Sequence, residues 1–303
     1  MPHDEVTIRP FVSRADYAAC VRLQREVWGE HFGDVVPPTI LLVSQRLGGV
    51  AAGAFDAGGR LLGFVFGVTG IRDGEPLHWS DMLAVRAEAR GTGLGRRLKL
   101  FQRDQLLERG VRRMHWTYDP LVARNANLNL NSLGAVPVEY VVNLYGETGS
   151  SLHAGLDTDR FIVEWRLDEA APAGGRTPGD RASVPPADGS LPGSHAPSAN
   201  VGSPPIIDVE WAVGERPLLG EPCVRVAAPA DIDALKASDS SRARAWQRMQ
   251  RLAFTHYLGR GYRVSGFEHH APPADSYYLV AKTDGAVRSA PARTPPAAAV
   301  PDR

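Results

Sequence analysis

The chain has 303 residues, and its 34 lysine and arginine side chains balance 34 aspartate and glutamate side chains, so its formal net charge is zero. A neutral chain has no general attraction for nucleic acid or anionic membranes, which argues against both as partners. Two cysteines argue against a disulfide framework, and no apolar run is long enough to span a bilayer, so we expect a soluble cytoplasmic protein.

The first part of the chain predicts one strand, two helices and three strands, in that order. The first helix is well marked because Ser13 and Asp16 can form a capping box at its start. The second helix follows Pro37 and Pro38 and is closed by a Gly-Gly pair. The predicted ranges are 6–11 for the first strand, 14–28 and 40–47 for the helices, and 50–55, 61–68 and 78–85 for the remaining strands.

A glycine-rich segment follows the strand over 78–85 and leads into a helix that begins near Leu94. Gly91, Gly93 and Gly95 permit positive φ angles and leave no Cβ atom in the way of a ligand. The first N–H groups of a helix lack backbone partners and lie at its positive end, so such a junction attracts phosphate. Basic side chains gather at the same place, namely Arg90, Arg96, Arg97 and Lys99. The segment therefore predicts an anion site, best suited to a pyrophosphate.

The spacing excludes two other phosphate loops. A Walker loop requires Gly-Lys followed by Ser or Thr, which this segment lacks. A dinucleotide fingerprint requires its third glycine one position later, and an acidic residue about 20 positions further on. Here the residues near that distance are Met114, His115 and Trp116. The pattern that remains is Arg90-x-x-Gly93-x-Gly95.

The elements after the loop continue the alternation of helices and strands. A helix over 94–109 is strongly periodic, and its predicted inner side is formed by Leu94, Leu98, Phe101, Gln105 and Leu106. The further predictions are a strand over 113–118, a helix over 121–133 and strands over 138–145 and 160–167.

This order of elements, together with the motif, resembles the GNAT superfamily of acyltransferases and its coenzyme A pyrophosphate loop. The run from His115 to Leu130, with Leu133-Gly134-Ala135 after it, is similar to a bacterial branch of predicted acetyltransferases that has a C-terminal extension. The resemblance covers about the first 168 residues. It implies an α/β (α+β) fold with a mixed, mostly antiparallel central sheet flanked by helices, and a smaller C-terminal α/β region.

The resemblance also implies where coenzyme A binds. In such folds the fourth and fifth strands splay apart and the pantetheine arm lies in the gap. The residues implied as cofactor-binding are Leu83, Ala84, Val85, Arg90, Gly91, Thr92, Gly93, Leu94, Gly95, Arg96 and Asn125. The implied reaction is direct attack of an amine on the thioester of acetyl-CoA or another acyl-CoA, with no metal and no covalent enzyme intermediate.

Direct aminolysis needs a base for the amine and an acid for the leaving thiolate. Asp81 is the first candidate for the base because alternation places it with Trp79 and Leu83 on one face; capping or an ion pair is the alternative. His115 is the next candidate, followed by Asp119, and a half-buried structural role is equally open for His115. The superfamily often has a tyrosine where this chain has Leu130, so the acid is unassigned; Tyr140 is a candidate beside Tyr118 and Tyr145.

The organisation of the chain changes after residue 169. Residues 170–205 are rich in Ala, Pro, Gly and Ser and predict a disordered linker, as do residues 284–303 for the tail. Residues 206–283 predict a smaller α/β region that packs on the domain 1–169 or on a partner, so a homodimer is possible. The expected ranges are 206–211 and 223–227 for strands, 243–258 for a helix after a shorter one, and 262–267 and 277–281 for strands. The segment 259–264 echoes 108–113, which suggests either a degenerate half-repeat or, with more weight, a common helix-glycine-strand junction.

Three functions stay open at this stage. The first is an N-acyltransferase that acts on a small-molecule amine. The second keeps the fold but uses succinyl-CoA or a similar donor on an amino acid. The third is a catalytically silent coenzyme A sensor or scaffold, because the usual acid position holds Leu130.

Overall fold

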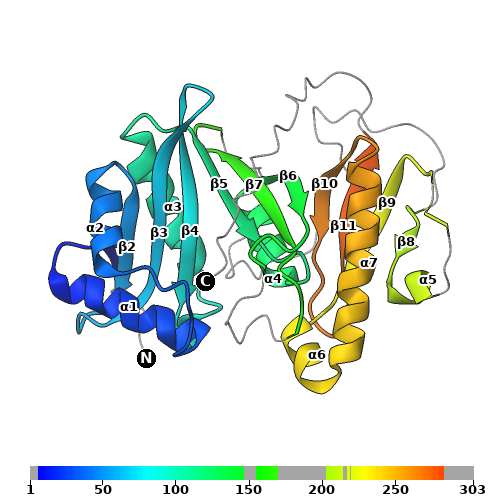
Figure 1. Ribbon diagram of the computed structural model, residues 1–303, viewed down its shortest axis with the longest axis horizontal. Helices are drawn as coiled ribbons and strands as arrows, with labels where there is room; N and C mark the ends of the chain where they lie inside the picture. The colour runs from blue at the N-terminus through cyan, green and yellow to red at the C-terminus, as the bar shows by residue number, and fades with distance from the viewer. Residues whose placement is uncertain (1–5, 147–154, 170–202, 214–216, 219, 283–303) are drawn as a thin grey trace, which may run out of the picture.

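The structure is a computed structural model, and it describes residues 6–146, 155–169, 203–213, 217–218 and 220–282. Their strands form two sheets that lie side by side (Figure 1). The larger sheet has seven strands in the order β1-β2-β3-β4-β5-β7-β6, and the smaller has four in the order β10-β11-β9-β8. The predicted fold class is confirmed, because only the β4–β5 pair of the larger sheet is parallel.

The N-terminal elements follow the predicted order. They are β1 (Thr7–Pro10), α1 (Arg14–Trp28), α2 (Pro38–Arg46), β2 (Val50–Phe55), β3 (Leu61–Arg72) and β4 (Glu75–Val85). The capping box at α1 is present, since Ser13 Oγ accepts the Asp16 N–H and the Asp16 carboxylate accepts the Ser13 N–H, both at 3.1 Å. β3 and β4 are longer than predicted because Asp73 and Gly74 adopt positive φ and form a tight hairpin turn between them.

Helices cover both faces of the larger sheet. On one face α1 and α2 enclose a core that includes Leu23, Phe64 and Met82. On the other lies α3 (Leu94–Leu107), which follows a 3₁₀ turn, η1 (Ala87–Ala89). The predicted buried face of α3 is partly wrong, because Lys99 and Gln102 are buried there in place of Phe101 and Gln105. Spacing of four residues from Leu94 through Leu98 leads to Gln102, not to Phe101.

The segment after α3 completes the larger sheet. β5 (Arg113–Tyr118) has the predicted bounds, and β6 (Val136–Val141) and β7 (Arg160–Arg166) follow. The predicted single helix over 121–133 is instead a short α4 (Ala123–Ala126) that widens into a π-helical turn, η2 (Asn127–Ser132). The Leu133 N–H bonds to the Leu128 carbonyl, five residues back, in a stretch of asparagines that favour α-helix weakly.

The smaller sheet comes from the C-terminal region. Its elements are β8 (Ile206–Ile207), α5 (Val209–Val213), β9 (Cys223–Ala228), α6 (Ile232–Ser238), α7 (Ser240–Leu258), β10 (Tyr262–Glu268) and β11 (Ser276–Lys282). The strand predicted over 206–211 stops at Ile207, because the Asp208 side chain accepts the Trp211 N–H at 2.7 Å and starts a helix.

The smaller sheet repeats the arrangement of half of the larger one. β8 and β9 are parallel, β9 pairs with β11, and β11 pairs with β10, in the way that β4, β5, β7 and β6 pair. In this correspondence α7 and β10 match the helix and strand after β5. The echo between 259–264 and 108–113 joins junctions that do not correspond, since 108–113 leads into β5 and 259–264 leads into β10, the counterpart of β6, so the echo is not part of this repeated arrangement.

The two sheets share one hydrophobic core. Phe161 of β7 contacts Phe254 of α7 and Tyr278 of β11, with ring centroids 4.7 and 5.6 Å apart. These contacts support the proposal that the C-terminal region packs on the first domain. The predicted linker and tail fall largely outside the described residues. Among the described helices, none has the length and apolar character that crossing a membrane requires.

Candidate active site

The glycine segment presents a row of free amides. In the described part of the chain, the backbone N–H groups from Gly91 to Arg96 have no hydrogen-bond acceptor, and the next one, of Arg97, bonds to the Gly93 carbonyl at 3.1 Å. Gly91 and Gly93 have φ of 77° and 81°, which turns the chain so that successive amides point outward. No side chain caps α3, and its first turn holds no acidic residue. This junction has the donors that a pyrophosphate requires.

The arginines of the predicted basic cluster lie near this loop, and their role toward a phosphate stays a prediction, whereas the lysine is turned away from it. Arg90 and Arg97 are exposed and Arg96 is half-buried beside the helix start. Lys99 is 3% exposed and faces the sheet, where its Nζ bonds to Ser80 Oγ at 2.7 Å. One helical turn beyond the loop, the same side of α3 is already packed on β4 and β5, so Lys99 does not reach a phosphate at the loop.

The gap expected between the fourth and fifth strands is present. β4 and β5 pair only at His78 with Met114 and at Trp79 with His115, and they diverge beyond this end (Figure 1). The closed end of the gap is therefore marked by Trp79 and His115. Its open end lies at Val85, next to the free amides.

Two of the three backbone positions predicted on β4 face the gap. The Arg86 N–H donates to the Leu62 carbonyl of β3 at 2.8 Å. Because adjacent residues of an antiparallel strand direct their backbone groups to opposite sides, Val85 and Leu83 face the gap. By the same alternation Ala84 faces β3, which corrects its predicted role as a pantetheine contact.

Asp81 occupies a β-bulge. Met82 is opposite Phe66 and Ser80 is opposite Gly67, so Asp81 is the extra residue in β4. The bulge reverses the alternation, and Asp81 cannot share one face with both Trp79 and Leu83 as predicted. Asp81 is exposed, and partial desolvation followed by the nearby charge of Asp34 raises its pKa.

His115 belongs to a buried pair with a residue that the sequence did not indicate. His115 is 6% exposed, and its Nε2 lies 3.0 Å from Glu164 Oε2 on β7. The hydrogen bond to His115, ahead of desolvation, holds the pKa of Glu164 below its usual value, so Glu164 is ionised. His115 Nδ1 is buried and has no hydrogen-bond partner among the described residues. Only the β5–β7 register brings these two residues together.

Tyr140 is held in the junction between the sheets. Its hydroxyl donates to Asp159 Oδ2 at 2.7 Å, and its ring packs against Phe161 and Phe254. Burial, followed by the charge of Asp159, raises the pKa of Tyr140. The hydroxyl proton is therefore engaged within the protein, and the role of Tyr140 as an acid stays a prediction that this geometry does not favour.

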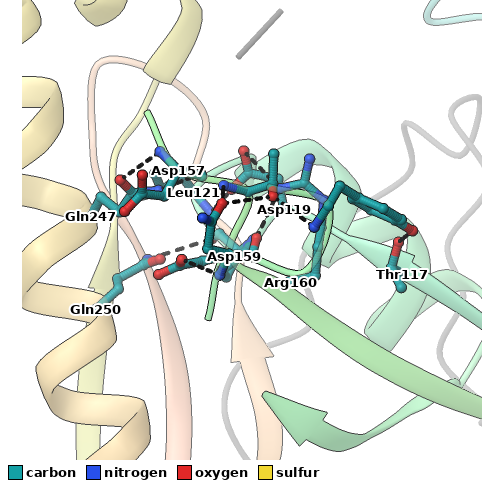
Figure 2. A network of polar contacts seen from close by, with 12 residues as sticks. Thr117, Asp119, Leu121, Asp157, Asp159, Arg160, Gln247 and Gln250 are labelled. Carbon is teal, nitrogen blue, oxygen red and sulfur yellow. Dashed lines mark hydrogen bonds and ion pairs between the residues drawn. The ribbon is translucent and has the colours of Figure 1, made fainter. Parts of the chain in front are cut away.

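Asp159 belongs to a polar network at the same junction (Figure 2). Arg251 of α7 bonds to both Asp159 oxygens, at 2.8 and 2.7 Å, and to Asp157 at 2.7 Å. Asp119, at the end of β5, accepts the Leu121 N–H at 2.9 Å and lies 3.8 Å from Arg160. Burial raises the pKa of Asp119. The network links β5, β7 and α7, which indicates a structural role for Asp119.

Tyr145, which follows β6, reaches back to β5. Its hydroxyl bonds to Thr117 Oγ1 at 2.8 Å, on the same side of β5 as His115. Desolvation raises its pKa first, and the charges of Asp81 and Asp34 also act in this direction. Tyr145 thus shares an electrostatic environment with the candidate base Asp81.

The asparagine-rich turn is mainly structural. Asn129 is 4% exposed and accepts the Trp116 indole N–H at 3.1 Å. Asn131 donates to Asn127 and to the Phe267 carbonyl of the second sheet. Asn125 is half-buried, and its cofactor role stays a prediction. The described residues hold no cluster of metal ligands.

Strand order, gap and amide loop together define a mixed α/β protein, and its architecture is similar to that of GNAT acetyltransferases. No model of a known family and no curated protein matches the chain. Among solved structures, a GNAT-family acetyltransferase from Streptococcus pneumoniae is 18% identical, with 54% of this chain and 99% of that chain covered and a TM-score of 0.44.

Two further structures match over a similar share of the chain. The ribosomal-protein-S18-alanine N-acetyltransferase from Escherichia coli is 18% identical, covering 56% of this chain and 98% of its own, with a TM-score of 0.42. An aminoglycoside 6'-acetyltransferase type Ii is 18% identical, covering 54% and 99%, with a TM-score of 0.43. At these identities and TM-scores the similarities say nothing about which residues act.

Proposed function

We propose that this chain is an acyl-CoA-dependent N-acyltransferase, which transfers an acetyl group to the amine of a small molecule. The observation that carries the proposal is the free row of amides from Gly91 to Arg96 at the open end of the β4–β5 gap. Coenzyme A has a pyrophosphate for such amides and an extended arm for the gap. The residues present fit this co-substrate, since Arg90 and Arg96 add positive charge beside the first turn of α3, which holds no acidic side chain.

The direction of the arm follows from the strands. From Val85 at the open end to Trp79 at the closed end, β4 spans roughly 20 Å of extended chain. A pyrophosphate on the amides would leave the thioester near the closed end and the bulge at Asp81. The backbone groups of Leu83 and Val85 would meet the amide groups of the arm on the way.

Asp81 is the proposed base for the acceptor. It is exposed at the bulge, and Asp34 lies near enough to affect its pKa. Two carboxyl groups at one place favour a positively charged amine. Asp81 would take a proton from the ammonium group, and the resulting amine would attack the thioester carbon.

The direct test measures binding and turnover separately. Calorimetric titration with coenzyme A measures binding, and release of free thiol from acetyl-CoA or succinyl-CoA against a panel of amines and amino acids measures transfer. We expect binding and amine-dependent thiol release. Binding without thiol release for every donor and amine would refute the enzyme and leave a coenzyme A sensor.

A matched pair of variants tests the site. Gly93→Glu places a carboxylate among the amides and should abolish binding. Gly59→Glu is the control, because Gly59 also has positive φ, 78° against 81°, and open space around it, but lies in the β2–β3 turn. Equal loss of binding in both variants would contradict the proposed site.

A further inference from the structure

We propose that His115, oriented by Glu164, carries a proton to the thiolate that leaves during the transfer. This inference rests on the proposed function. It assigns the general acid, because this chain has Leu130 where the superfamily often has a tyrosine. It starts from three facts about His115: it is buried, its Nε2 is bonded to Glu164, and its Nδ1 has no partner in the described part of the chain.

The Glu164 contact sets which ring nitrogen holds the hydrogen. An ionised carboxylate only accepts hydrogen bonds, so the hydrogen of the 3.0 Å bond belongs to Nε2. Nδ1 then carries the free lone pair. A buried acceptor without a partner destabilises the protein, and an incoming N–H donor would remove that cost.

The position of His115 suits the sulfur rather than the pyrophosphate. It is the last β5 residue paired to β4, opposite Trp79, at the closed end of the gap. Met114 and Trp116 face α3 through Lys99, so His115 faces the opposite side of the sheet, together with Thr117. The thioester end of an arm that enters from the amide loop would reach this point.

The proton balance follows in four steps. Asp81 takes one proton from the ammonium group, and the amine lone pair forms the C–N bond at the thioester carbon. His115 Nδ1 takes a proton from the attacking nitrogen, and the ring charge is balanced by Glu164. The C–S bond breaks with its electron pair on sulfur, which receives the proton from Nδ1. Asp81 returns its proton to solvent, so amide, free coenzyme A thiol and one proton are formed.

Because Arg166 bonds to the second oxygen of Glu164, the effect of Glu164 on the His115 tautomer can be tested separately from its packing. Glu164 Oε1 lies 3.4 Å from Arg166 Nε, while Oε2 serves His115. In Glu164→Gln the arginine, which only donates, would keep the amide oxygen, and the amide NH₂ would face Nε2. His115 must then hold its hydrogen on Nδ1, the wrong tautomer for the shuttle.

Charged groups lie on the same side of the sheet as His115 or near it, and from β5 itself Arg113 shares this face two residues earlier. From β7 they are Glu164 and, behind it, Arg166; from β4 the nearest acid along the strand is Asp81 at the bulge. Asp168→Asn is the matched control, since it makes the same change of carboxylate to amide in an exposed pair with Arg112.

The test combines ¹⁵N NMR of the histidine rings with steady-state kinetics on the full chain. The His115 signals are assigned by their loss in His115→Gln. We expect the Nε2–H tautomer in the unmodified protein and the Nδ1–H tautomer in Glu164→Gln. We expect kcat to fall by about 10²-fold or more in Glu164→Gln with KM for acetyl-CoA unchanged, as for loss of an acid or base. Glu164→Gln combined with Arg166→Met should restore both the tautomer and part of kcat, because the amide is then free to turn.

Several outcomes would overturn the inference. One is an Nδ1–H tautomer in the unmodified protein; another is full kcat in Glu164→Gln or an equal loss in Asp168→Asn. Absence of thiol release from the unmodified protein would refute the proposed function instead, and the tautomer measurement would still decide the Glu164–His115 pairing.

Discussion

Ser80 and Met82 lie two residues apart on β4 but face opposite sides of the sheet. Ser80 Oγ bonds to Lys99 and Gln102 of α3, while Met82 packs in the core beneath α1 and α2. The bulge at Asp81 causes this reversal, and it lies just beyond the last residue pair of β4 and β5. The bulge therefore positions the candidate base beside the opening gap.

Gly95 tests whether a ligand approaches the loop backbone. A Cβ atom at Gly95 would meet only a Leu83 methyl group at 3.6 Å, so Gly95→Ala should keep the stability of the protein. We expect it to weaken coenzyme A binding by at least about tenfold, or about 1.4 kcal/mol, because the added methyl group would hold the phosphate away from the amides. Calorimetric titration measures this change.

Gly110→Ala is the control for Gly95→Ala. Gly110 lies in the turn after α3 with φ of 75° and open space around it, so alanine there strains the backbone. We expect a lower melting temperature and unchanged affinity for coenzyme A. Unchanged affinity in Gly95→Ala would indicate that no ligand approaches the loop closely.

Asp81 predicts the pH dependence of the transfer. A base must be ionised, and the raised pKa of Asp81 means that activity falls on acidification at a higher pH than an ordinary aspartate would give. Asp34→Asn removes a nearby negative charge, lowers this pKa and should move the acid limb of kcat/KM to lower pH. Asp81→Asn should remove the limb and reduce the rate by about 10²–10⁴-fold. An acid limb that is the same in all three proteins would exclude Asp81 as the base.

Burial of Lys99 predicts that the free energy of unfolding increases as the pH rises above neutral. Desolvation lowers its pKa to about 7 from 10.5, so between these values the unfolded chain binds more protons than the folded one. Stability therefore rises with pH from about 7 to 10.5, and this gain is absent below about pH 7. Lys99→Met should raise the free energy of unfolding at neutral pH and remove the rise. Urea unfolding on both sides of neutrality measures it, and an unaltered rise in the variant would show that another group is responsible.

Arg251 predicts a loss of stability at the junction of the two sheets. Burial acts to raise the pKa of Asp159, but hydrogen bonds from Arg251 and Tyr140 outweigh it and hold the pKa low. Asp159 is 3% exposed, so Arg251→Gln leaves a buried charge without its cation and should cost about 3–5 kcal/mol. The stabilisation from this pair is present above the pKa of an unfolded aspartate and is lost as the pH falls through the lower folded value.

Arg242→Gln is the control for Arg251→Gln. Arg242 pairs with Glu210 at 3.2 Å with both side chains exposed, so its removal should cost less than about 1 kcal/mol. Chemical denaturation of both variants measures the difference. Equal costs would mean that the Asp159 network does not hold the two sheets together.

The sequence predicted the loop well because its information is local. Positive φ at Gly91 and Gly93 and an uncapped helix start are properties of adjacent residues, and both are present. The capping box at Ser13 and the bounds of β5 were predicted for the same reason.

The sequence did not predict features that depend on distant partners. No sequence pattern near Glu164 indicates a role for it. It reaches His115 only because β7 lies between β5 and β6 in the sheet. Lys99 was assigned to the phosphate cluster, although helical spacing turns it toward Ser80 of β4. Nothing in the sequence near Tyr140 indicates that its hydroxyl bonds to Asp159, which Arg251 of the C-terminal region anchors.

The sequence by itself determined the amide loop, the order of the elements and the fold class, because hydrophobic periodicity, glycine and capping act within a few residues. The tertiary structure alone decided which side chains meet. Strand register, the bulge at Asp81 and the junction of the two sheets fix the partners of His115, Lys99 and Tyr140. A one-residue bulge exchanges the faces of a strand, and no local pattern in β4 marks where it falls.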